Sequence, residues 1–413
     1  MDNLFLFTSQ YPEKRGDGSF VKNEIEDLAK NFKKIYIAKL DWNKDIERYK
    51  LPENVEVVFE GFASRKEIVT KGLFNFCSIV PFFFLLRQDL FRIKKLRHIK
   101  IFFIALLMGR GLASSSRIKK ILKSNSSNDM VLYFFWGTGM SYVLPWIKTH
   151  KHKVVTKLHR GDLYVEVLGY IPFRKFILNR VDTIITISNS GKNYLYNYLK
   201  KLQIKNNKIT TIKLGTFDRG VFTNKSKNTE QKKIISCSSI TMVKRVPFLF
   251  EILNELAISK KIKWIHFGDG VGMQDLKENI RKSKNNNLEI ELKGYVDNNE
   301  VINFYKNNHV DLFINVSTSE GIPVSIMEAT SFNIPVLATD AGGTGELVGD
   351  SLGTGKLVPV NASVEEIVED INTMLFLEYN NYTPRKFWMQ NHDARLNNIK
   401  LIQTLKNNSE KII

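Results

Sequence analysis

The chain has 413 residues, of which 43% are hydrophobic and 25% are charged, and this composition is typical of globular proteins and excludes wholesale disorder. Lysine and arginine number 61 against 42 aspartates and glutamates, which gives a formal net charge of +19, and such an excess usually serves an anionic partner. The two cysteines, Cys77 and Cys237, are too few for a disulfide framework or a cysteine-based zinc site.

The length predicts two or three domains at roughly 150 residues each, and neither a secretory signal nor a spanning helix is expected. The apolar stretch at the N-terminus is short and has no basic leader. The longest apolar run, residues 74–86, is interrupted by Asn75, Ser78 and Pro81, whereas a spanning helix needs about 20 apolar residues. We therefore expect a cytoplasmic protein.

The N-terminal half alternates short apolar runs with helical stretches. It predicts a helix at residues 20–30 and a long helical insertion at about 74–123. Strands are expected at residues 4–7, 35–38, 131–135, 154–158, 183–187 and 210–213. A polar stretch, residues 223–231, is predicted to be a linker.

The C-terminal half repeats this rhythm more clearly. Strands are expected at residues 233–237, 264–267, 288–292, 311–316 and 335–338, with helices at 246–258, 273–282, 299–307 and 323–331. Such alternation indicates βαβ units and parallel sheets buried on both faces.

The predicted fold class is therefore α/β, with two doubly wound, Rossmann-like domains facing each other across a cleft. We expect the N-terminal domain at residues 1–222 and the C-terminal domain at 232–384. The segment 385–413 is expected to be a C-terminal helix that packs back on the N-terminal domain.

Ligands of such sheets bind at the carboxyl ends of the strands, and the loop after residues 311–316 carries the strongest signal. Pro323 suits the first position of a helix, Gly321 allows close backbone approach, and the helix start favours an anion. Glu320 and Glu328 flank this point, and carboxylates accept hydrogen bonds from sugar hydroxyls. The pattern favours a ligand that joins phosphate to hydroxyl-rich rings. The alternative is that Glu320 complements the helix dipole and Glu328 is solvated.

Other loops at the same sheet edge add to this pattern. Lys244 and Arg245 follow the first strand of the C-terminal domain, and a cation there would pair with a diphosphate. The alternative is a solvated basic turn. Glycine-rich loops follow at residues 268–270 and 341–345.

These motifs together resemble the donor-binding region of the group 1 glycosyltransferases. The resemblance rests on residues 319–323, Glu328 with Ala329, 335–340 and 342–343, and it is strongest from about residue 234 to 360. It implies a retaining enzyme of the GT-B fold, related to glycogen synthase and to bacterial polysaccharide-building transferases. The match is specific for fold and donor class, and it leaves the acceptor open.

The resemblance also implies roles for individual residues. Glu320 would contact the hydroxyls of the donor sugar, and Glu328 would hold the hydroxyls of the ribose. The backbone amides of Gly321 and Ile322 would lie near the sugar and the diphosphate, and Lys244 would bind the diphosphate.

One position departs from the family pattern. The family usually has an arginine five residues before the lysine, where this chain has Ser239. Arg245 is the candidate substitute for that cation.

Two loops of the N-terminal half also resemble the family. His159, after the strand at 154–158, is similar to the histidine that reaches the donor sugar, whereas the alternative is a structural histidine beside a helix-capping Asp162. The first βα loop contains Gly16 and Gly18, and it resembles the glycine loop beneath the diphosphate, although Asp17 separates the two glycines.

The predicted function is therefore transfer of a sugar from a UDP- or GDP-sugar to a saccharide, with retention, in capsule or O-antigen synthesis. Glu320 and His159 are the predicted catalytic residues. The predicted donor-binding residues are Lys244, Arg245, Gly321, Ile322, Glu328 and Gly18. No metal is expected, because there is no Asp-x-Asp motif and histidine is scarce; no cofactor is expected, since the nucleotide sugar is a substrate.

The helical insertion bears on the acceptor. Apolar runs at residues 82–86 and 101–108 are mixed with basic residues, namely Arg87, Arg92, Lys94, Lys95, Arg97, Lys100 and Arg110. Such helices suit an anionic membrane surface. This favours a lipid-linked acceptor and a peripheral location at the inner face of the cell membrane. The alternative is a core helix with a solvated basic face.

Three rival functions are compatible with parts of the sequence. A nucleic-acid-binding protein would fit the charge, but the basic residues are scattered among acidic ones and no binding motif is present, so no nucleic acid partner is expected. A nucleotide-sugar epimerase or a phosphorylase would share the architecture. An inactive scaffold is favoured by Ser239 alone.

Overall fold

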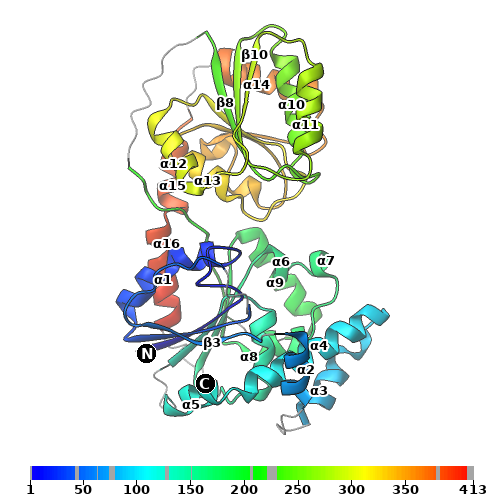
Figure 1. Ribbon diagram of the computed structural model, residues 1–413, viewed down its shortest axis with the longest axis vertical. Coiled ribbons are helices and arrows are strands. Elements are labelled where there is room, and N and C mark those ends of the chain that lie inside the picture. The colour runs from blue at the N-terminus through cyan, green and yellow to red at the C-terminus, as the bar shows by residue number, and fades with distance from the viewer. Residues whose placement is uncertain are drawn as a thin grey trace. The chain divides into compact units, whose positions relative to one another are not determined.

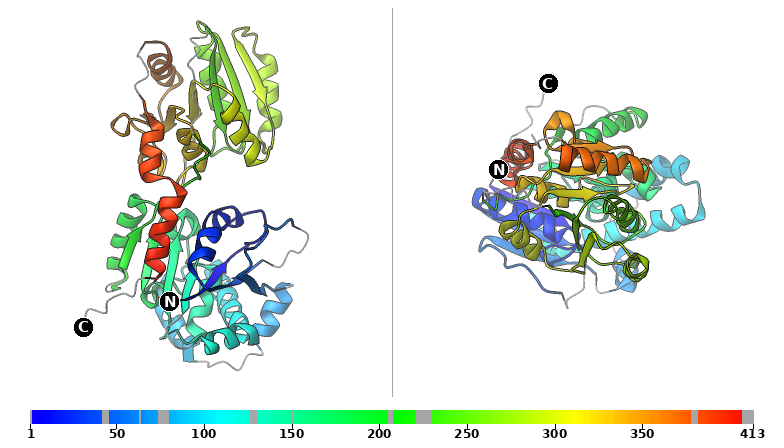
Figure 2. Two further views of the ribbon diagram at one scale, coloured as in Figure 1. Left: turned by 90° about the vertical axis from the view of Figure 1, so that its left-hand side faces the viewer. Right: turned by 90° about the horizontal axis from the view of Figure 1, so that it is seen from above.

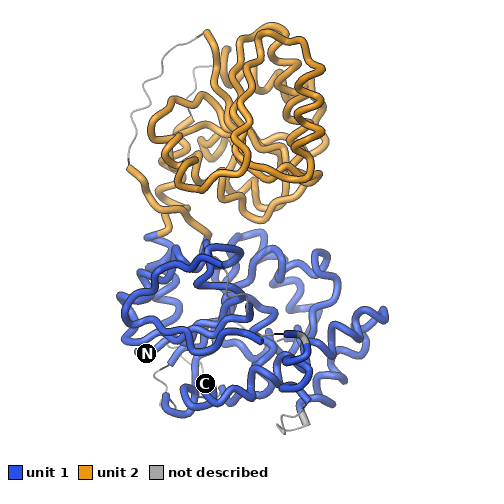
Figure 3. The backbone as a smooth tube through the Cα atoms, in the orientation of Figure 1, with its two compact units in different colours: residues 1–213, 395–413 blue, residues 214–394 orange. Residues whose placement is uncertain are grey.

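The computed structural model describes residues 2–41, 46–62, 64–73, 80–125, 130–149, 151–204, 208–220, 230–377 and 382–406. The chain divides into two compact units. Unit 1 comprises Met1–Lys213 with Arg395–Ile413, and unit 2 comprises Leu214–Ala394, so the backbone passes between the units twice (Figure 3). Each unit is built on its own parallel sheet, which confirms the predicted α/β class.

Seven parallel strands form the sheet of unit 1, in the order β3-β2-β1-β4-β5-β6-β7 (Figure 1). Alternate residues of a strand point to opposite faces, so Phe5 and Phe7 belong to one core cluster, and Leu4 and Leu6 to another. The strands are β1 (Asn3–Thr8), β2 (Lys34–Lys39), β3 (Val55–Glu60), β4 (Met130–Phe134), β5 (Lys153–Leu158), β6 (Thr183–Thr186) and β7 (Lys208–Thr211).

Helices cover both faces of this sheet. On the face of Leu4, α1 (Gly18–Asn31) lies beside α16 (Ala394–Lys406), where the Asn398 amide donates a hydrogen bond to the Asn23 carbonyl at 2.7 Å (Figure 2). The other helices of the unit are α2 (Arg65–Leu73), α3 (Val80–Asp89), η1 (Leu90–Arg92), α4 (Leu96–Ser114), α5 (Ser116–Ser124), η2 (Gly139–Trp146), α6 (Arg160–Leu163), α7 (Val165–Leu168), α8 (Arg174–Arg180) and α9 (Asn189–Lys201).

The predicted insertion contains α3, η1, α4 and α5, and its residues 74–79, with Cys77, lie outside the described residues. The second half of α4 packs into the core of unit 1. A Cβ atom at Gly109 would lie 2.1 Å from the carbonyl oxygen of Tyr142, so only glycine fits there. Among the described residues no single helix is long and apolar enough to cross a membrane. By length and composition together, only α4 and α5 taken as a pair would suffice, and this pair is bent by 62°.

Six parallel strands form the sheet of unit 2, in the order β10-β9-β8-β11-β12-β13. The strands are β8 (Lys232–Cys237), β9 (Ile262–Phe267), β10 (Leu288–Leu292), β11 (Leu312–Asn315), β12 (Val336–Thr339) and β13 (Gly355–Val358). The helices are α10 (Val246–Leu256), α11 (Met273–Lys282), α12 (Asn298–Asn307), α13 (Val324–Ser331), η3 (Thr344–Glu346), η4 (Asp350–Leu352), α14 (Val364–Asn372), η5 (Thr373–Leu377) and α15 (Pro384–Asn391). Because all strands are parallel, the loops that follow them gather at one edge of the sheet.

The predicted C-terminal segment 385–413 divides between the units. Helix α16 packs on unit 1, but α15 belongs to unit 2. Trp388 of α15 is fully buried, and its indole N–H donates a hydrogen bond to the Thr216 hydroxyl at 2.9 Å. Arg385 forms a two-pronged pair with the Asp218 carboxylate, with distances of 2.8 and 2.9 Å. These contacts hold α15 where the chain enters unit 2.

Candidate active site

Three loops of unit 2 meet at the carboxyl end of its sheet. The Thr318 amide, after β11, donates a hydrogen bond to the Val243 carbonyl, after β8, at 2.8 Å. The Gly343 amide, after β12, donates to the Gly321 carbonyl at 2.9 Å. The backbone itself therefore fixes the loops on which the predicted donor-binding residues lie.

The centre of this edge is an ion pair between Lys244 and Glu320. The lysine Nζ donates to the glutamate Oε1 at 2.6 Å, and the Asn315 side-chain amide donates to the same oxygen at 3.2 Å. The carboxylate is 7% exposed and the lysine side chain 26% exposed. The structure thus brings together two predicted site residues that are 76 positions apart in the sequence.

Glycines after β12 allow the loops to approach this closely. Gly342 has a φ of +61°, and a Cβ atom there would lie 2.0 Å from the carbonyl oxygen of Glu320. A Cβ atom at Gly343 would lie 2.4 Å from the carbonyl oxygen of Gly321. Any larger residue would therefore push the Glu320 loop out of place.

The start of α13 differs slightly from the prediction. Pro323 lies at the position before the helix, and the helix begins at Val324. Ile322 is buried, whereas the backbone amides of Gly321 and Ile322 donate to no group of the described residues. Two backbone donors are thus left at the end of the loop, next to the ion pair.

Arg245 has a structural task in unit 2. It adopts the left-handed conformation, with a φ of 48°, and its Nε donates to the Val316 carbonyl at 2.7 Å. Its guanidinium stacks over the Phe248 ring at 4.7 Å, and burial lowers its pKa. The side chain fastens the β8–α10 loop to the end of β11, and its role as the substitute for the cation missing at Ser239 stays a prediction.

Glu328 of α13 is buried, not solvated as in the alternative interpretation. Its carboxylate accepts a hydrogen bond from the Asn298 side chain at 2.8 Å. Burial raises its pKa to about 7, against the opposing effects of Asn298 and Arg219. A carboxyl that titrates near neutrality can both accept and donate hydrogen bonds at the edge of the sheet. Asn298 gave no signal in the sequence beyond its place at the start of a helix.

His159 follows β5 in unit 1 and is buried between two aromatic rings. Its ring centroid lies 4.8 Å from that of Phe135 and 4.5 Å from that of Trp136. Burial holds its pKa well below the usual value, so the imidazole is neutral at pH 7. Within the described part of the chain, neither ring nitrogen has a hydrogen-bond partner. The Asp162 carboxylate accepts the His159 backbone N–H at 2.7 Å, which is the helix-capping contact of the alternative interpretation.

The first βα loop of unit 1 is organised by Asp17, which separates Gly16 from Gly18 in the sequence. Its carboxylate accepts five hydrogen bonds, from the backbone amides of Ser9, Gln10 and Tyr11, the Thr8 hydroxyl and the Trp136 indole, at 2.6 to 3.3 Å. The Gly18 amide donates to the Arg15 carbonyl at 2.9 Å, and a Cβ atom at Gly18 would lie 1.9 Å from the Glu13 carbonyl. Gly18 is thus required for packing, and the amides of the loop already serve an internal carboxylate.

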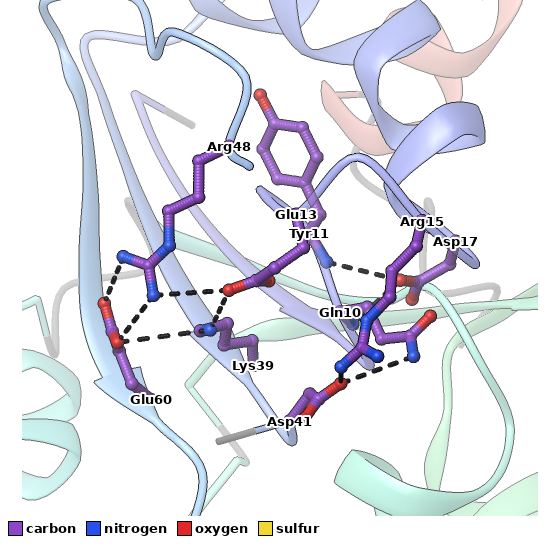
Figure 4. Close-up of polar contacts among 9 residues, drawn as sticks. All are labelled: Gln10, Tyr11, Glu13, Arg15, Asp17, Lys39, Asp41, Arg48 and Glu60. Atoms are coloured by element: carbon purple, nitrogen blue, oxygen red, sulfur yellow. Dashed lines mark hydrogen bonds and ion pairs between the residues drawn. The ribbon is translucent and has the colours of Figure 1, made fainter. Parts of the chain in front are cut away.

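Beside this loop, a network of ion pairs closes the ends of β2 and β3 (Figure 4). Lys39 and Glu13 are both fully buried and form a pair. The Arg48 guanidinium contacts Glu13 at 3.2 Å and forms a two-pronged pair with Glu60 at 3.0 and 3.1 Å. Each buried charge therefore has a counter-charge, which makes its burial tolerable. The sequence pattern gave no sign of this network.

Comparisons with known proteins agree with the resemblance to the group 1 glycosyltransferases, most clearly in unit 2. Residues 220–387 match the family model of the glycosyl transferases group 1. The O-antigen biosynthesis glycosyltransferase WbnH of Escherichia coli is 30% identical over 238 residues, which cover 55% of this chain and 62% of that protein. The lipopolysaccharide outer core galactosyltransferase WaaB, in its apo form, has a TM-score of 0.68 at 14% identity and covers 98% of this chain and 100% of that chain. The pneumococcal O-GlcNAc transferase GtfA, in complex with UDP and GlcNAc, has a TM-score of 0.54 at 16% identity over 70% of this chain and 59% of that chain.

These comparisons differ in what they establish. The family model matches almost all of unit 2, which carries the ion pair and Glu328. The structure of WaaB, which covers 98% of this chain, shares a fold with two parallel-sheet domains, and this confirms the predicted GT-B fold. The alignment with WbnH spans 62% of the length of that relative.

Replacement of Asp17 tests its part in unit 1. Asp17→Ala should lower the free energy of unfolding by at least about 3 kcal/mol, because a charged acceptor with several buried donors is lost. Urea unfolding followed by circular dichroism measures this. Glu26→Ala, which removes an exposed acid from α1, the helix that follows Asp17, should change the value by less than about 0.5 kcal/mol. Equal effects of the two variants would contradict the role of Asp17.

The raised pKa of Glu328 predicts a pH-dependent stability. In the folded chain its carboxyl holds a proton up to a pKa of about 7, whereas in the unfolded chain the pKa is near its ordinary value, about 4.3. The folded state therefore binds more protons between these values, and the free energy of unfolding falls as the pH rises through this window. The melting temperature of Glu328→Gln should therefore rise relative to that of the wild type as the pH is raised from 5 to 8. A constant difference between the two chains across these pH values would refute the shift.

Proposed function

We propose that this chain, which has the GT-B fold, is a group 1 glycosyltransferase and transfers a sugar from a nucleotide-sugar donor to a saccharide acceptor during the synthesis of a cell-surface polysaccharide. The observation that carries the proposal is the pair of Lys244 and Glu320 at the carboxyl edge of the unit 2 sheet. WbnH, named for O-antigen biosynthesis, supports the choice of pathway class.

Lys244 and the free amides form the proposed diphosphate site. A cation and two backbone donors at a helix start suit an oxyanion. Lys244 contacts Glu320, and the free amides belong to Gly321 and Ile322, the two residues that follow Glu320 in the chain. The donor would be a UDP- or GDP-sugar. UDP is the first nucleotide to test, because the structurally similar GtfA was solved in complex with UDP and GlcNAc.

Glu320 is the proposed contact of the donor sugar. When a diphosphate takes over Lys244, the carboxylate is released from its cation and can accept hydrogen bonds from sugar hydroxyls. Asn315 still donates to it and fixes its orientation. Glu328 is proposed to accept hydrogen bonds from the ribose hydroxyls.

The proposed reaction retains the configuration of the anomeric carbon. As the bond between the sugar and the phosphate breaks, positive charge develops on the sugar and negative charge on the diphosphate. Lys244 and the loop amides stabilise the diphosphate, and the carboxylate of Glu320 lies close to the sugar. The acceptor hydroxyl attacks from the same face as the leaving group, and its proton passes to the departing phosphate oxygen. His159, as a neutral imidazole, is proposed to bind a hydroxyl of the donor sugar.

The proposal needs no metal, because the chain itself supplies the cation. In the part of the chain that the structure describes, no three histidine, cysteine, aspartate or glutamate side chains gather as metal ligands. A chelator should therefore leave the transfer rate unchanged.

The acceptor is proposed to be a lipid-linked saccharide, and the protein to be a peripheral protein at the inner, cytoplasmic face of the cell membrane. The support is the mixture of apolar and basic residues on α3 and α4. No nucleic acid partner is proposed.

Turnover with a UDP- or GDP-sugar tests the assignment of Glu320 and Lys244. Glu320→Gln should reduce the release of nucleoside diphosphate in the presence of acceptor by about 10²- to 10³-fold, since a preorganised charge near the reacting sugar is lost. Lys244→Ala should weaken donor binding as well as turnover. The anomeric configuration of the product, read by NMR, tests retention.

Matched variants keep this test specific. Glu278→Gln and Lys277→Ala change exposed residues of α11 and should behave as the wild type. Near-normal turnover of Glu320→Gln, in a chain that melts as the wild type does, would overturn the assignment.

A further inference from the structure

One face of the α3–α4 hairpin exposes large apolar side chains to solvent. Phe91, in the connecting turn, is 87% exposed, and Leu96, at the start of α4, is 86% exposed. Phe83 of α3 and Ile99 and Phe103 of α4 are also exposed. We call these five residues the apolar hairpin face. Contiguous apolar surface of this kind marks an interaction site in a folded protein.

Spacing and ring contacts place four of these side chains together, and Phe91 lies in the turn that joins the two helices. Leu96, Ile99 and Phe103 are spaced by three and four residues, which places them on one side of α4. Phe83 and Phe103 both flank Phe82, with ring centroids 5.1 and 6.4 Å from it, so α3 and α4 contribute to the same surface. Figure 1 shows this hairpin at the margin of unit 1, away from the strands.

The charges around this face are almost all positive. Residues 80–110, which span α3, η1 and most of α4, contain seven lysines and arginines and a single acid, Asp89. Arg87 and Lys100 lie one helical turn from Phe83 and Leu96, and more basic residues, Lys94, Lys95 and Arg97, follow the connecting turn. All five are exposed, and none forms an ion pair within the described residues.

The single acid is used inside the fold and neutralises nothing at the surface. Asp89 is fully buried, and its carboxylate accepts hydrogen bonds from the Tyr170 hydroxyl at 2.6 Å and the Phe173 amide at 2.8 Å. It also pairs with Arg92 at 3.1 Å. These contacts anchor the connecting turn to the core of unit 1, so the apolar hairpin face is presented by a fixed element.

We propose that the apolar hairpin face docks on the surface of a lipid bilayer that contains anionic phospholipids. The aromatic and aliphatic side chains enter the boundary between headgroups and acyl chains, and the five cations contact lipid phosphates. Helix α4 lies along the surface and does not cross it, because its second half is packed in the core. The docking rests on the hairpin alone, and it deepens the proposed function by placing unit 1 where a lipid-linked acceptor is found.

Vesicle flotation of the full chain tests the docking. The wild type should float with phosphatidylcholine vesicles that contain phosphatidylglycerol, and much less with phosphatidylcholine alone or at high salt. The double variant Phe91→Ser and Leu96→Ser, and the double variant Lys94→Glu and Lys95→Glu, should each reduce the bound fraction by about tenfold or more. The matched controls are Ile258→Ser and the pair Lys282→Glu and Lys284→Glu, which alter exposed residues of unit 2 and should float as the wild type does.

The outcomes separate the docking from the catalytic proposal. No flotation of the wild type, or equal flotation of the hairpin variants and their controls, would overturn the docking. Self-association in sedimentation that Phe91→Ser with Leu96→Ser abolishes, without vesicle binding, would assign the face to a second copy of the chain and also overturn it. Release of nucleoside diphosphate with a soluble acceptor is measured in the same chains. A wild type that floats with the vesicles but releases no nucleoside diphosphate would refute the proposed function and leave the docking intact.

Discussion

The ion pair between Lys244 and Glu320 determines the state of the site before any donor arrives. A cation and a carboxylate that lie 2.6 Å apart neutralise each other, so neither member of this pair is a free charge before a ligand binds. In the proposed function, the diphosphate of the donor competes for the lysine and liberates the carboxylate. The proposed donor, which joins a diphosphate to a hydroxyl-rich ring, thus has one group for each member of the pair.

The surroundings serve to hold this pair in place. Gly342 and Gly343 let the loop after β12 press against the Glu320 loop, and Arg245 fastens the loop after β8 to the end of β11. The first loop of unit 1 differs, because its backbone amides donate to the carboxylate of Asp17. The two sheet edges therefore look alike in sequence, as glycine-containing loops after a buried strand. In the described residues, however, amides of the first unit 1 loop are bonded to Asp17, whereas the Gly321 and Ile322 amides of unit 2 donate to no other group.

The sequence predicted the rhythm of strands and helices because buried parallel strands are almost purely apolar, as β4 and β11 show. It missed β3 and β13, which lie at the sheet edges, pair with one neighbour each and are partly polar or begin with a glycine. Glu320, Glu328 and Lys244 were predicted because they stand in local motifs. Other contacts were not predicted, because they join residues that only the folded chain brings together. These are the contacts of Asn298 with Glu328 and of Asn315 with Glu320, the hydrogen bonds to Asp17, and the pair of Lys39 with Glu13.

Calorimetric titration of the wild type, Glu320→Gln and Lys244→Ala with a nucleoside diphosphate and with the matching nucleotide sugar tests the central claim most directly. The account predicts that Lys244→Ala weakens both ligands. It predicts that Glu320→Gln binds the nucleoside diphosphate more tightly than the wild type, because the lysine no longer has a competing partner, and binds the nucleotide sugar no more tightly. If Glu320→Gln leaves the affinity for both ligands unchanged, the ion pair does not govern donor binding and the account is contradicted.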